Sequence, residues 1–367
     1  MHTIVVDLSV FAEDYQGARQ LFLGAAAQAK GDVTSFAHPL TGPHGEPLFC
    51  DIFYQGDPDA SAVLVTISAT HGIEGFCGSG VQVHCLRHGA NQSPNVGLLH
   101  IHAINPYGFA WLRRVNEDNV DLNRNFIDFS QPLPDNPGYT ELAPHLLPKD
   151  LSSTTLLRAN QALELYRQTH GERAYEIAVS GGQYFHPKGL FYGGVEKSWS
   201  RKLIEKIVGD LDLARRERVA IIDFHTGLGP YGYGELICDH PPRSPNTAYV
   251  KRWYGPSVTQ PALSTSTSVP KWGLSDIGWQ DLLGEHAGFV AAEFGTYSTA
   301  QLFSVLQQDH WLHNHTSGAW QLPEIQQIKH AMKQHFYPQR SDWKELVIFR
   351  GTQIINQAID GLAEEFS

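Results

Sequence analysis

The sequence is poor in cysteine and in basic residues, and both shortages exclude classes of protein. Lys and Arg number 27 against 38 Asp and Glu, which gives a formal net charge of −11. This balance disfavours nucleic acid and anionic lipid as partners, because phosphate groups are bound by basic surfaces. Four cysteines are too few for a disulfide scaffold and lack the spacing of a metal site, so we expect buried, reduced thiols at Cys50, Cys77, Cys85 and Cys238.

The chain also lacks the signals of export, membrane insertion and modular organisation. Its start, Met1 to Val10, has neither the charged region nor the long apolar core of a signal peptide, and no stretch reaches the length of a membrane span. No linker, repeat or low-complexity tract interrupts the sequence. We therefore predict a cytoplasmic protein in which residues 1–367 form one domain, with 42% hydrophobic residues to build a large core.

What the sequence does contain is an alternation of two kinds of apolar segment. Short apolar runs predict strands, and segments with apolar residues spaced near 3.6 predict helices. The predicted strands are Phe49 to Tyr54, Ala62 to Ser68, Gly97 to Ile104, Val219 to Phe224, Tyr233 to Cys238 and Gly288 to Glu293. The predicted helices include Ala12 to Lys30, Gly78 to His88, Thr154 to His170, Lys197 to Leu213, Thr299 to Leu312, Glu324 to Phe336 and Asp342 to Ala363. This order indicates an α/β fold, with a mostly parallel, mixed central sheet between two layers of helices.

A histidine and a glutamate follow the predicted strand that begins at Ala62. The strand leads into Ala69-Thr-His71-Gly-Ile-Glu74-Gly, where the two side chains lie three residues apart. Composition alone produces about one such His-x-x-Glu pair in a chain with this many histidines, so a loop histidine beside a solvated glutamate is the alternative. A catalytic zinc ion needs three protein ligands of the His/His/carboxylate type and an open position for water. The pair therefore needs a third ligand from elsewhere in the chain.

Two further strands end in the residues that such a site requires. The run beginning at Val219 ends in His225, and the run beginning at Gly288 ends in Glu293. Ligands bind beyond the carboxyl ends of the strands in sheets of this kind, so all these side chains are expected at one edge. Glu293 follows three apolar residues, where an unpaired carboxylate that merely ends a strand is costly. The sequence thus predicts one zinc ion held by His71, Glu74 and His225, with Glu293 as general base.

A fourth motif lies between the first two ligand positions. It begins with Asn105-Pro-Tyr-Gly-Phe and ends with Asp121-Leu-Asn123-Arg124-Asn125. With His-x-x-Glu before it, and Asp-x-His and a strand-terminal Glu after it, the chain resembles the zinc carboxypeptidase superfamily. That superfamily includes the carboxypeptidase A type peptidases and the aspartoacylase and succinylglutamate desuccinylase type deacylases. The motifs span residues 65–295, and the chain looks like an uncharacterised, metallopeptidase-like bacterial branch.

The second ring nitrogen of a ligand histidine is normally held by a carboxylate or carbonyl, which fixes the tautomer and aims the ring. The resemblance assigns Asp121 to this task for His71. Asp223 stands two residues before His225, on the same face of its strand. Either it holds His225 in the same way, or it pairs with a nearby cation.

The resemblance also implies how a substrate is held. Asn123 and Arg124 match the pair that binds the substrate's terminal carboxylate, which suits the planar guanidinium fork. Arg113 best matches the arginine that stabilises the oxyanion of the tetrahedral intermediate, with Arg114 as a shifted alternative. We expect one of these two arginines to face the site and the other to form a structural salt bridge.

These features predict a zinc-dependent, carboxypeptidase-like metallopeptidase, which cleaves an amide bond adjacent to a free carboxylate by metal-activated water and a Glu base. Its substrate would be a peptide C-terminus. An alternative is a deacylase acting on a small N-acyl amino acid, which uses the same zinc, base and arginines. A further alternative is a non-catalytic protein that binds a metal or ligand, although a binder has no need of Glu293. No serine nucleophile elbow or phosphate-binding loop supports another chemistry.

Overall fold

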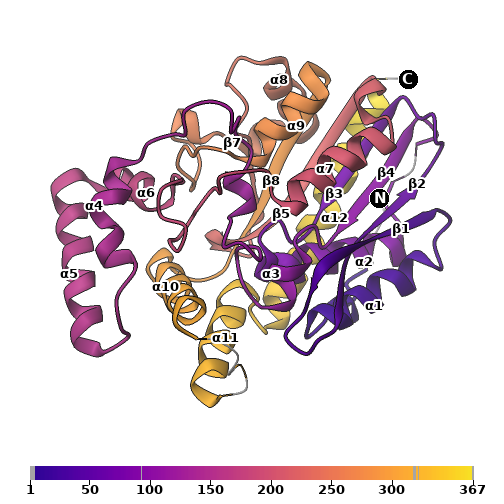
Figure 1. The fold of residues 1–367 in the computed structure, drawn as a ribbon. Coiled ribbons are helices and arrows are strands. Elements are labelled where there is room, and N and C mark those ends of the chain that lie inside the picture. The colour runs from indigo at the N-terminus through magenta and orange to yellow at the C-terminus, as the bar shows by residue number, and fades with distance from the viewer. Residues whose placement is uncertain (1–4, 92, 317–319, 321, 366–367) are drawn as a thin grey trace.

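A computed structural model describes residues 5–91, 93–316, 320 and 322–365 (Figure 1). Within these residues eight strands form one sheet in the order β1-β2-β4-β3-β5-β8-β6-β7. The strands are β1 (Asp32–Thr41), β2 (Pro47–Gln55), β3 (Ala62–Ile67), β4 (Val96–His102), β5 (Arg218–Tyr231), β6 (Glu235–Ile237), β7 (Val258–Thr259) and β8 (Ala287–Gly295). The central strands β4, β3, β5 and β8 run parallel, whereas β2 and β6 pair antiparallel with the two outer members of this group. The predicted α/β class, with a mixed sheet, is confirmed.

Alternating residues of the central strands enter two separate cores. Ala62 and Leu64 of β3 pack in the core that contains helices α1, α2, α8 and α12, whereas Val63 and Val65 pack in the core that contains α7 and α9. The helices are α1 (Tyr15–Ala26), α2 (Gly75–His88), α3 (Pro106–Ala110), α4 (Pro137–Leu146), α5 (Ser153–His170), α6 (Glu172–Ser180), α7 (Trp199–Asp210), α8 (Pro245–Tyr254), α9 (Ser275–Leu283), α10 (Thr299–His315), α11 (Pro323–Phe336) and α12 (Ser341–Glu364). Helices thus cover both faces of the sheet, as predicted.

All seven predicted helices and all six predicted strands have counterparts, and the additional elements are a mostly exposed edge strand, a two-residue strand and short helices. Most residues of β1 are exposed, so this edge strand has no buried face to produce an alternating pattern. The helices α3, α4, α6, α8 and α9 are only five to ten residues long. In Figure 1, α4, α5 and α6 form a group beside the sheet, near the end at which the central strands finish.

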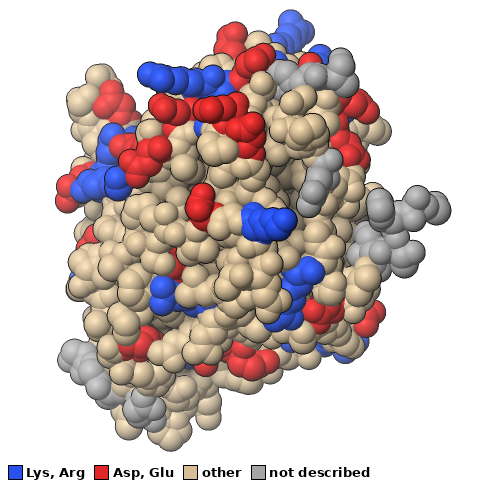
Figure 2. All heavy atoms as spheres, turned by 90° about the vertical axis from the view of Figure 1, so that its right-hand side faces the viewer, with Lys and Arg blue, Asp and Glu red and all other residues tan. Residues whose placement is uncertain are grey.

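The surface and the cysteines agree with the composition. Acidic and basic side chains are interspersed on the face shown in Figure 2, and no continuous basic band crosses it. All four cysteines are buried and free. Among the described residues no helix combines the length and the hydropathy of a membrane span. Residues 1–4, part of the segment expected to lack a signal, lie outside the described residues.

Candidate metal centre

His71 and Glu74 follow the carboxyl end of β3 and meet His225 of β5, which does not end before His225 as predicted but continues to Tyr231. One potential ligand atom from each of the three lies within 4.8 Å of the others, and all three side chains are buried. The Nδ1 atoms of the two histidines are 3.1 Å apart, and they lie 3.1 and 3.3 Å from the carboxylate oxygens of Glu74. Two imidazoles and one carboxylate therefore converge on a point that could hold one metal ion.

The turn after β3 bends sharply to place this pair of ligands. Ala69 has a left-handed backbone with φ of 62°, which a residue with a side chain adopts only at a cost. Two residues later His71 precedes a short 3-10 helix, η2 (Gly72–Glu74), that leads into α2. A Cβ on Gly72 would meet the carbonyl carbon of Gly108 at 2.0 Å. The turn is thus pressed against the Asn-Pro-Tyr-Gly-Phe segment, and only glycine fits at position 72.

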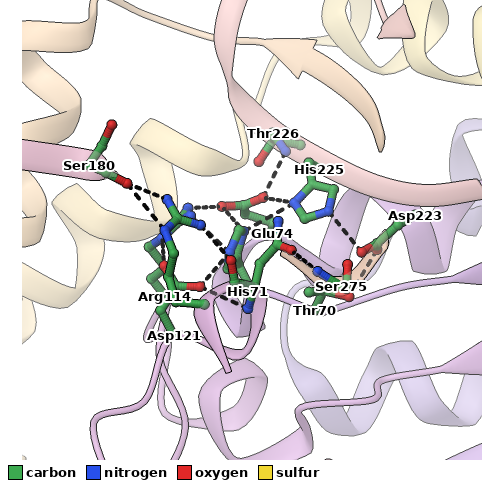
Figure 3. A network of polar contacts seen from close by, with 12 residues as sticks. Thr70, His71, Glu74, Arg114, Asp121, Ser180, Asp223, His225, Thr226 and Ser275 are labelled. Atoms are coloured by element: carbon green, nitrogen blue, oxygen red, sulfur yellow. Dashed lines mark hydrogen bonds and ion pairs between the residues drawn. The ribbon is translucent and has the colours of Figure 1, made fainter. Parts of the chain in front are cut away.

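The outer nitrogens of both histidine rings face carboxylates (Figure 3). Asp121 Oδ1 lies 3.0 Å from His71 Nε2, and Asp223 Oδ2 lies 2.9 Å from His225 Nε2. Asp223 also accepts a hydrogen bond of 2.9 Å from the Thr70 hydroxyl. Both rings are therefore oriented with Nδ1 towards Glu74, in the arrangement typical of histidines that bind a metal.

The charges around this point are unbalanced. Three buried carboxylates, those of Glu74, Asp121 and Asp223, and the half-buried carboxylate of Glu293 lie around the two histidines. Arg114 is the arginine that pairs with two of them, Glu74 at 2.7 Å and Asp121 at 3.2 Å. Burial lowers the pKa of His225, but the carboxylates of Asp223 and Glu74 outweigh burial and raise it well above its ordinary value. The site thus favours a positive charge between its ligands, which a divalent cation supplies.

Glu293 stands beside His225 on the neighbouring strand. The two residues are partners in the register of β5 and β8, and both line one pocket. The amide of Leu228 donates a hydrogen bond of 2.9 Å to Glu293 Oε1. Burial raises the pKa of Glu293 to about 7, and the nearby Glu74 carboxylate acts in the same direction. A carboxyl group with this pKa exchanges protons readily near neutral pH.

Of the two consecutive arginines, Arg114 faces the pocket and Arg113 does not. Arg113 donates to Asp309 at 3.1 Å and to Asn119 at 3.0 Å, and it is absent from the pocket wall. The first choice of Arg113 for the oxyanion is therefore corrected: this residue forms the structural salt bridge. Leu112, just before the pair, has a left-handed φ of 49° that helps to send the two side chains in different directions.

Asn123 and Arg124 both line the same pocket as the metal ligands. The Arg124 guanidinium donates to the carbonyl oxygens of Ser180 and Asn123 at 2.6 Å each. No carboxylate of the described residues forms an ion pair with Arg124. Asn123 Oδ1 accepts from the Ser275 amide at 2.8 Å. The structure thus brings the predicted carboxylate-binding pair to the site and leaves the arginine's charge unneutralised.

The pocket contains further residues that the sequence motifs did not indicate. Its wall includes Asp239 after β6, Lys271 in the loop before α9, and Glu176 and Ser180 at the end of α6. Asp239, Lys271 and Glu176 lie outside the predicted helices and strands and outside the recognised motifs, so the sequence patterns did not mark them. Among the described residues of the wall there is no tyrosine. Tyr184 is buried, and its hydroxyl donates a hydrogen bond of 2.8 Å to the Arg124 carbonyl oxygen.

Several solved structures are similar in fold at low identity. They include a murein-tripeptide amidase from Escherichia coli O157, with 14% identity, coverage of 81% of this chain and 97% of that chain, and a TM-score of 0.36. A metallo-carboxypeptidase from Burkholderia cenocepacia has 12% identity, coverage of 95% and 69%, and a TM-score of 0.39. An aspartoacylase family protein from Mesorhizobium loti has 13% identity, coverage of 78% and 67%, and a TM-score of 0.36. Overlaps as loose as these carry no functional argument.

Comparison at the sequence level gives a firmer result. No curated protein matches the chain. The sequence profile of one family, described as "Protein of unknown function (DUF2817)", matches residues 11–350. This match covers the metal-ligand group, the pocket and all eight strands of the sheet. The chain therefore belongs to the DUF2817 family.

Proposed function

We propose that the protein is a zinc-dependent hydrolase that cleaves an amide bond next to a free carboxylate, with a carboxypeptidase-like mode of action. The observation that carries this proposal is the convergence of His71, Glu74 and His225, with a carboxylate behind each histidine ring. Glu293 and Arg124 line the same pocket, where a base and a carboxylate-binding group are needed. Each element of an amide hydrolase of this type is thus present within one pocket.

The donor set suits zinc. Two imidazole nitrogens and one carboxylate are the ligands of many catalytic zinc sites, which keep a further position open. Two carboxylates behind the rings and only one paired arginine leave a negative surplus that a divalent cation balances. Zinc bound there would lower the pKa of a coordinated water from ~15.7 towards ~7 and would polarise the substrate carbonyl.

Glu293 is the proposed proton carrier. In its deprotonated form it takes a proton from the attacking water, and it then passes this proton to the nitrogen of the leaving amine. The hydrogen bond from the Leu228 amide holds one carboxylate oxygen, so the other oxygen remains for the water. A pKa of about 7 suits both steps, because the group gives up and accepts a proton at similar cost.

Arginines on two sides of the pocket bind the substrate. Arg114, held by Glu74 and Asp121, donates to the oxygen of the scissile carbonyl as negative charge develops on it. Arg124 and Asn123 bind the free carboxylate of the leaving residue. The phenyl ring of Phe191 lies 5.4 Å from the Arg114 guanidinium and 5.5 Å from that of Arg124, and helps to fix both.

A small pocket favours small substrates. The cavity measures about 80 Å³, which corresponds to roughly six water-sized groups. Part of its wall comes from the end of α6 and the following loop, within the long segment between Phe126 and Val219. This segment narrows access to the site, which keeps deacylation of an N-acyl amino acid as a second candidate beside cleavage of short peptides.

The test compares activity with metal binding in one variant. The purified protein is assayed against N-acetylated dipeptides with a free C-terminus, the same dipeptides as C-terminal amides, and N-acetyl amino acids. We expect hydrolysis only where the carboxylate is free. Glu293→Gln is expected to lower kcat by about 10²- to 10⁴-fold while zinc stays bound. The matched control Glu285→Gln changes an exposed glutamate before β8 and is expected to retain full activity.

Two outcomes would oppose the proposal. Equal hydrolysis of the free acids and the amides would show that Arg124 and Asn123 do not select a carboxylate. Unchanged activity in Glu293→Gln would remove the general base and with it this mechanism. A wild-type protein that binds zinc but cleaves none of the substrates would favour a non-catalytic binding protein.

A further inference from the structure

The pocket extends beyond the metal ligands to a loop that is fixed in place. This pocket loop, residues 264–273, is built around the buried carboxylate of Glu235 on β6. Glu235 Oε1 accepts from the Ser266 hydroxyl at 2.8 Å and from the Thr267 amide at 3.1 Å. At the other end of the loop the Gly273 carbonyl accepts from the Phe126 amide at 3.1 Å. The loop therefore presents its side chains to the pocket in a defined position.

Lys271 brings an ammonium group into the pocket without a carboxylate partner. Its Nζ donates to the Ser268 hydroxyl and, at 2.9 Å, to the Val269 carbonyl oxygen, both within the pocket loop. No ion pair joins it to any of the described residues. Burial, together with Arg124, lowers the pKa of Lys271 to about 8, so the group is still largely charged at neutral pH. A buried cation in this state is stabilised when an anion binds beside it.

Asp239 brings a carboxylate into the same pocket, also without a partner. It follows β6 and lines the wall together with Lys271. Its side chain forms no hydrogen bond and no ion pair with the described part of the chain. Lys271 and Arg124 act on Asp239 only through space, at more than ion-pair distance. An unpartnered carboxylate in a protein interior is costly, and a bound cation or hydrogen-bond donor removes that cost.

A second carboxyl group lies close enough to Asp239 to interact with it electrostatically. Asp276 is buried at the start of α9, and its Oδ1 atom has no hydrogen-bond partner among the described residues. Burial and the nearby Asp239 raise the pKa of Asp276 to about 8. Asp276 is therefore largely neutral at neutral pH, and Asp239 is the member of this pair that lines the pocket.

The unpaired charges define what fits. Arg124 and Lys271 each lack an anion, and two carboxylates of the wall, Asp239 and Glu176, lack a cation within ion-pair distance among the described residues. A leaving residue bound by its carboxylate at Arg124 extends its side chain towards Lys271 and Asp239. A side chain with only an ammonium group would leave Lys271 without an anion, and one with only a carboxylate would face Asp239. An apolar side chain would leave both charges buried and unpaired.

We propose that the pocket selects a leaving residue whose side chain ends in both an ammonium group and a carboxylate, with Asp239 binding the ammonium and Lys271 the carboxylate. The substrate class is an amide of a diamino dicarboxylic acid. This inference rests on the proposed hydrolase function and makes Asp239 and Lys271 specificity-determining residues of the site.

The test uses four N-acetyl-alanyl substrates that differ only at the far end of the leaving residue. 2,6-Diaminoheptanedioate carries both groups, lysine lacks the carboxylate, 2-aminoheptanedioate lacks the ammonium, and norleucine lacks both. We expect kcat/KM to be highest for the first and to fall about tenfold or more for each missing group. Asp239→Asn is expected to abolish the advantage of lysine over norleucine. Lys271→Met is expected to abolish the advantage of 2-aminoheptanedioate over norleucine.

Controls and a second readout separate this inference from the proposed function. Asp281→Asn and Lys251→Met make the same changes at exposed positions and should leave all ratios as in the wild type. Binding of the four free amino acids, measured by calorimetry without turnover, should follow the same order. Similar kcat/KM for all four dipeptides would overturn the inference while the hydrolase stands, as would a preference for lysine over the zwitterionic residue. No hydrolysis together with the expected binding order would overturn the hydrolase and retain the pocket's selectivity.

Discussion

Two regions of this molecule contain the same kinds of buried side chain and use them differently. At the carboxyl ends of β3 and β5, His71 and His225 lie with aspartates and Arg114. On β4, His100 and His102 lie with Asp51 and Arg19. We call the first group the pocket cluster and the second, which comprises His100, His102, Asp51 and Arg19, the sheet cluster.

The difference lies in the partners of the ring nitrogens. In the sheet cluster the Asp51 carboxylate forms an ion pair with Arg19 at 2.7 Å. The histidine rings contact hydroxyl groups instead: His100 contacts Thr66 at 2.6 Å, and His102 contacts Ser79 at 2.9 Å. Burial lowers the pKa of His100 to about 3 and that of His102 to about 4. The sheet cluster therefore contains neutral, structural histidines, whereas the carboxylates of the pocket cluster prepare its histidines for a cation.

The largest expected effect concerns the two arginines. Arg114→Lys keeps the positive charge but loses the planar fork that bridges Glu74 and Asp121. We expect kcat/KM to fall by about 10²-fold, because a donor to the developing oxyanion is lost. Arg19→Lys is the same change in the sheet cluster and should lower stability only. Steady-state kinetics of both variants test this contrast, and an equal loss in kcat/KM for the two would contradict it.

Next in size is the effect of the carboxylate behind a ligand ring. Asp121→Asn removes the charge that holds His71 Nε2 at 3.0 Å. The affinity for zinc should fall by about 10- to 100-fold, as is usual when such a partner is lost. Asp51→Asn, the matched change in the sheet cluster, should not alter it. Competition with a chromogenic chelator measures both affinities, and an unchanged affinity in Asp121→Asn would show that the aspartate does not support the ligand.

A smaller effect is expected from pH. A general base works only when deprotonated, and burial raises the pKa of Glu293 to about 7. The value of kcat/KM should therefore fall as pH drops below 7, by about tenfold for each further pH unit. The histidines of the sheet cluster, with pKa values of about 3 and 4, do not contribute to this limb. A flat profile between pH 8 and 5.5 would be incompatible with Glu293 as the base.

The smallest expected effect is on stability in acid. The pKa of His102 is about 4 in the folded chain and about 6.5 in an unfolded one. Between these values the unfolded chain binds a proton that the folded chain does not, so the free energy of unfolding falls as pH falls from 6.5 towards 4. Each pH unit costs about 1.4 kcal/mol for this group. In urea titrations at pH 6.5 and 5.5, His102→Gln should lose about 1 kcal/mol less stability than the wild type; an identical loss would refute this account.

The sequence predicted the pocket cluster well because simple rules govern it. The predicted strands end close to His71, His225 and Glu293, and parallel strands bring these positions to one edge, although β5 and β8 continue beyond His225 and Glu293 in the structure. Asp223 was placed on the face of His225 by strand alternation, although its partner stayed open until the structure showed the contact of 2.9 Å. These contacts depend on local periodicity and on the order of strands, which one sequence carries.

Residues whose position depends on distant segments could not be predicted. Arg113 and Arg114 are adjacent in the sequence but have different contacts. Arg113 pairs with Asp309, which lies 196 residues further along the chain, and both arginines follow the turn at Leu112. Lys271 lines the same pocket as Asp239 because the pocket loop folds around Glu235, and no repeating pattern marks such a loop. Specificity is therefore the part of the site that needed the three-dimensional structure.

The most direct test of the central claim is the metal content of three purified proteins after exhaustive dialysis. The wild type, His225→Gln in the pocket cluster and His102→Gln in the sheet cluster are compared by elemental analysis after zinc has been supplied. The account predicts about one zinc per chain in the wild type and in His102→Gln, and none in His225→Gln. A wild type without bound metal, or equal zinc in all three proteins, would contradict the assignment of His71, Glu74 and His225 as a metal centre.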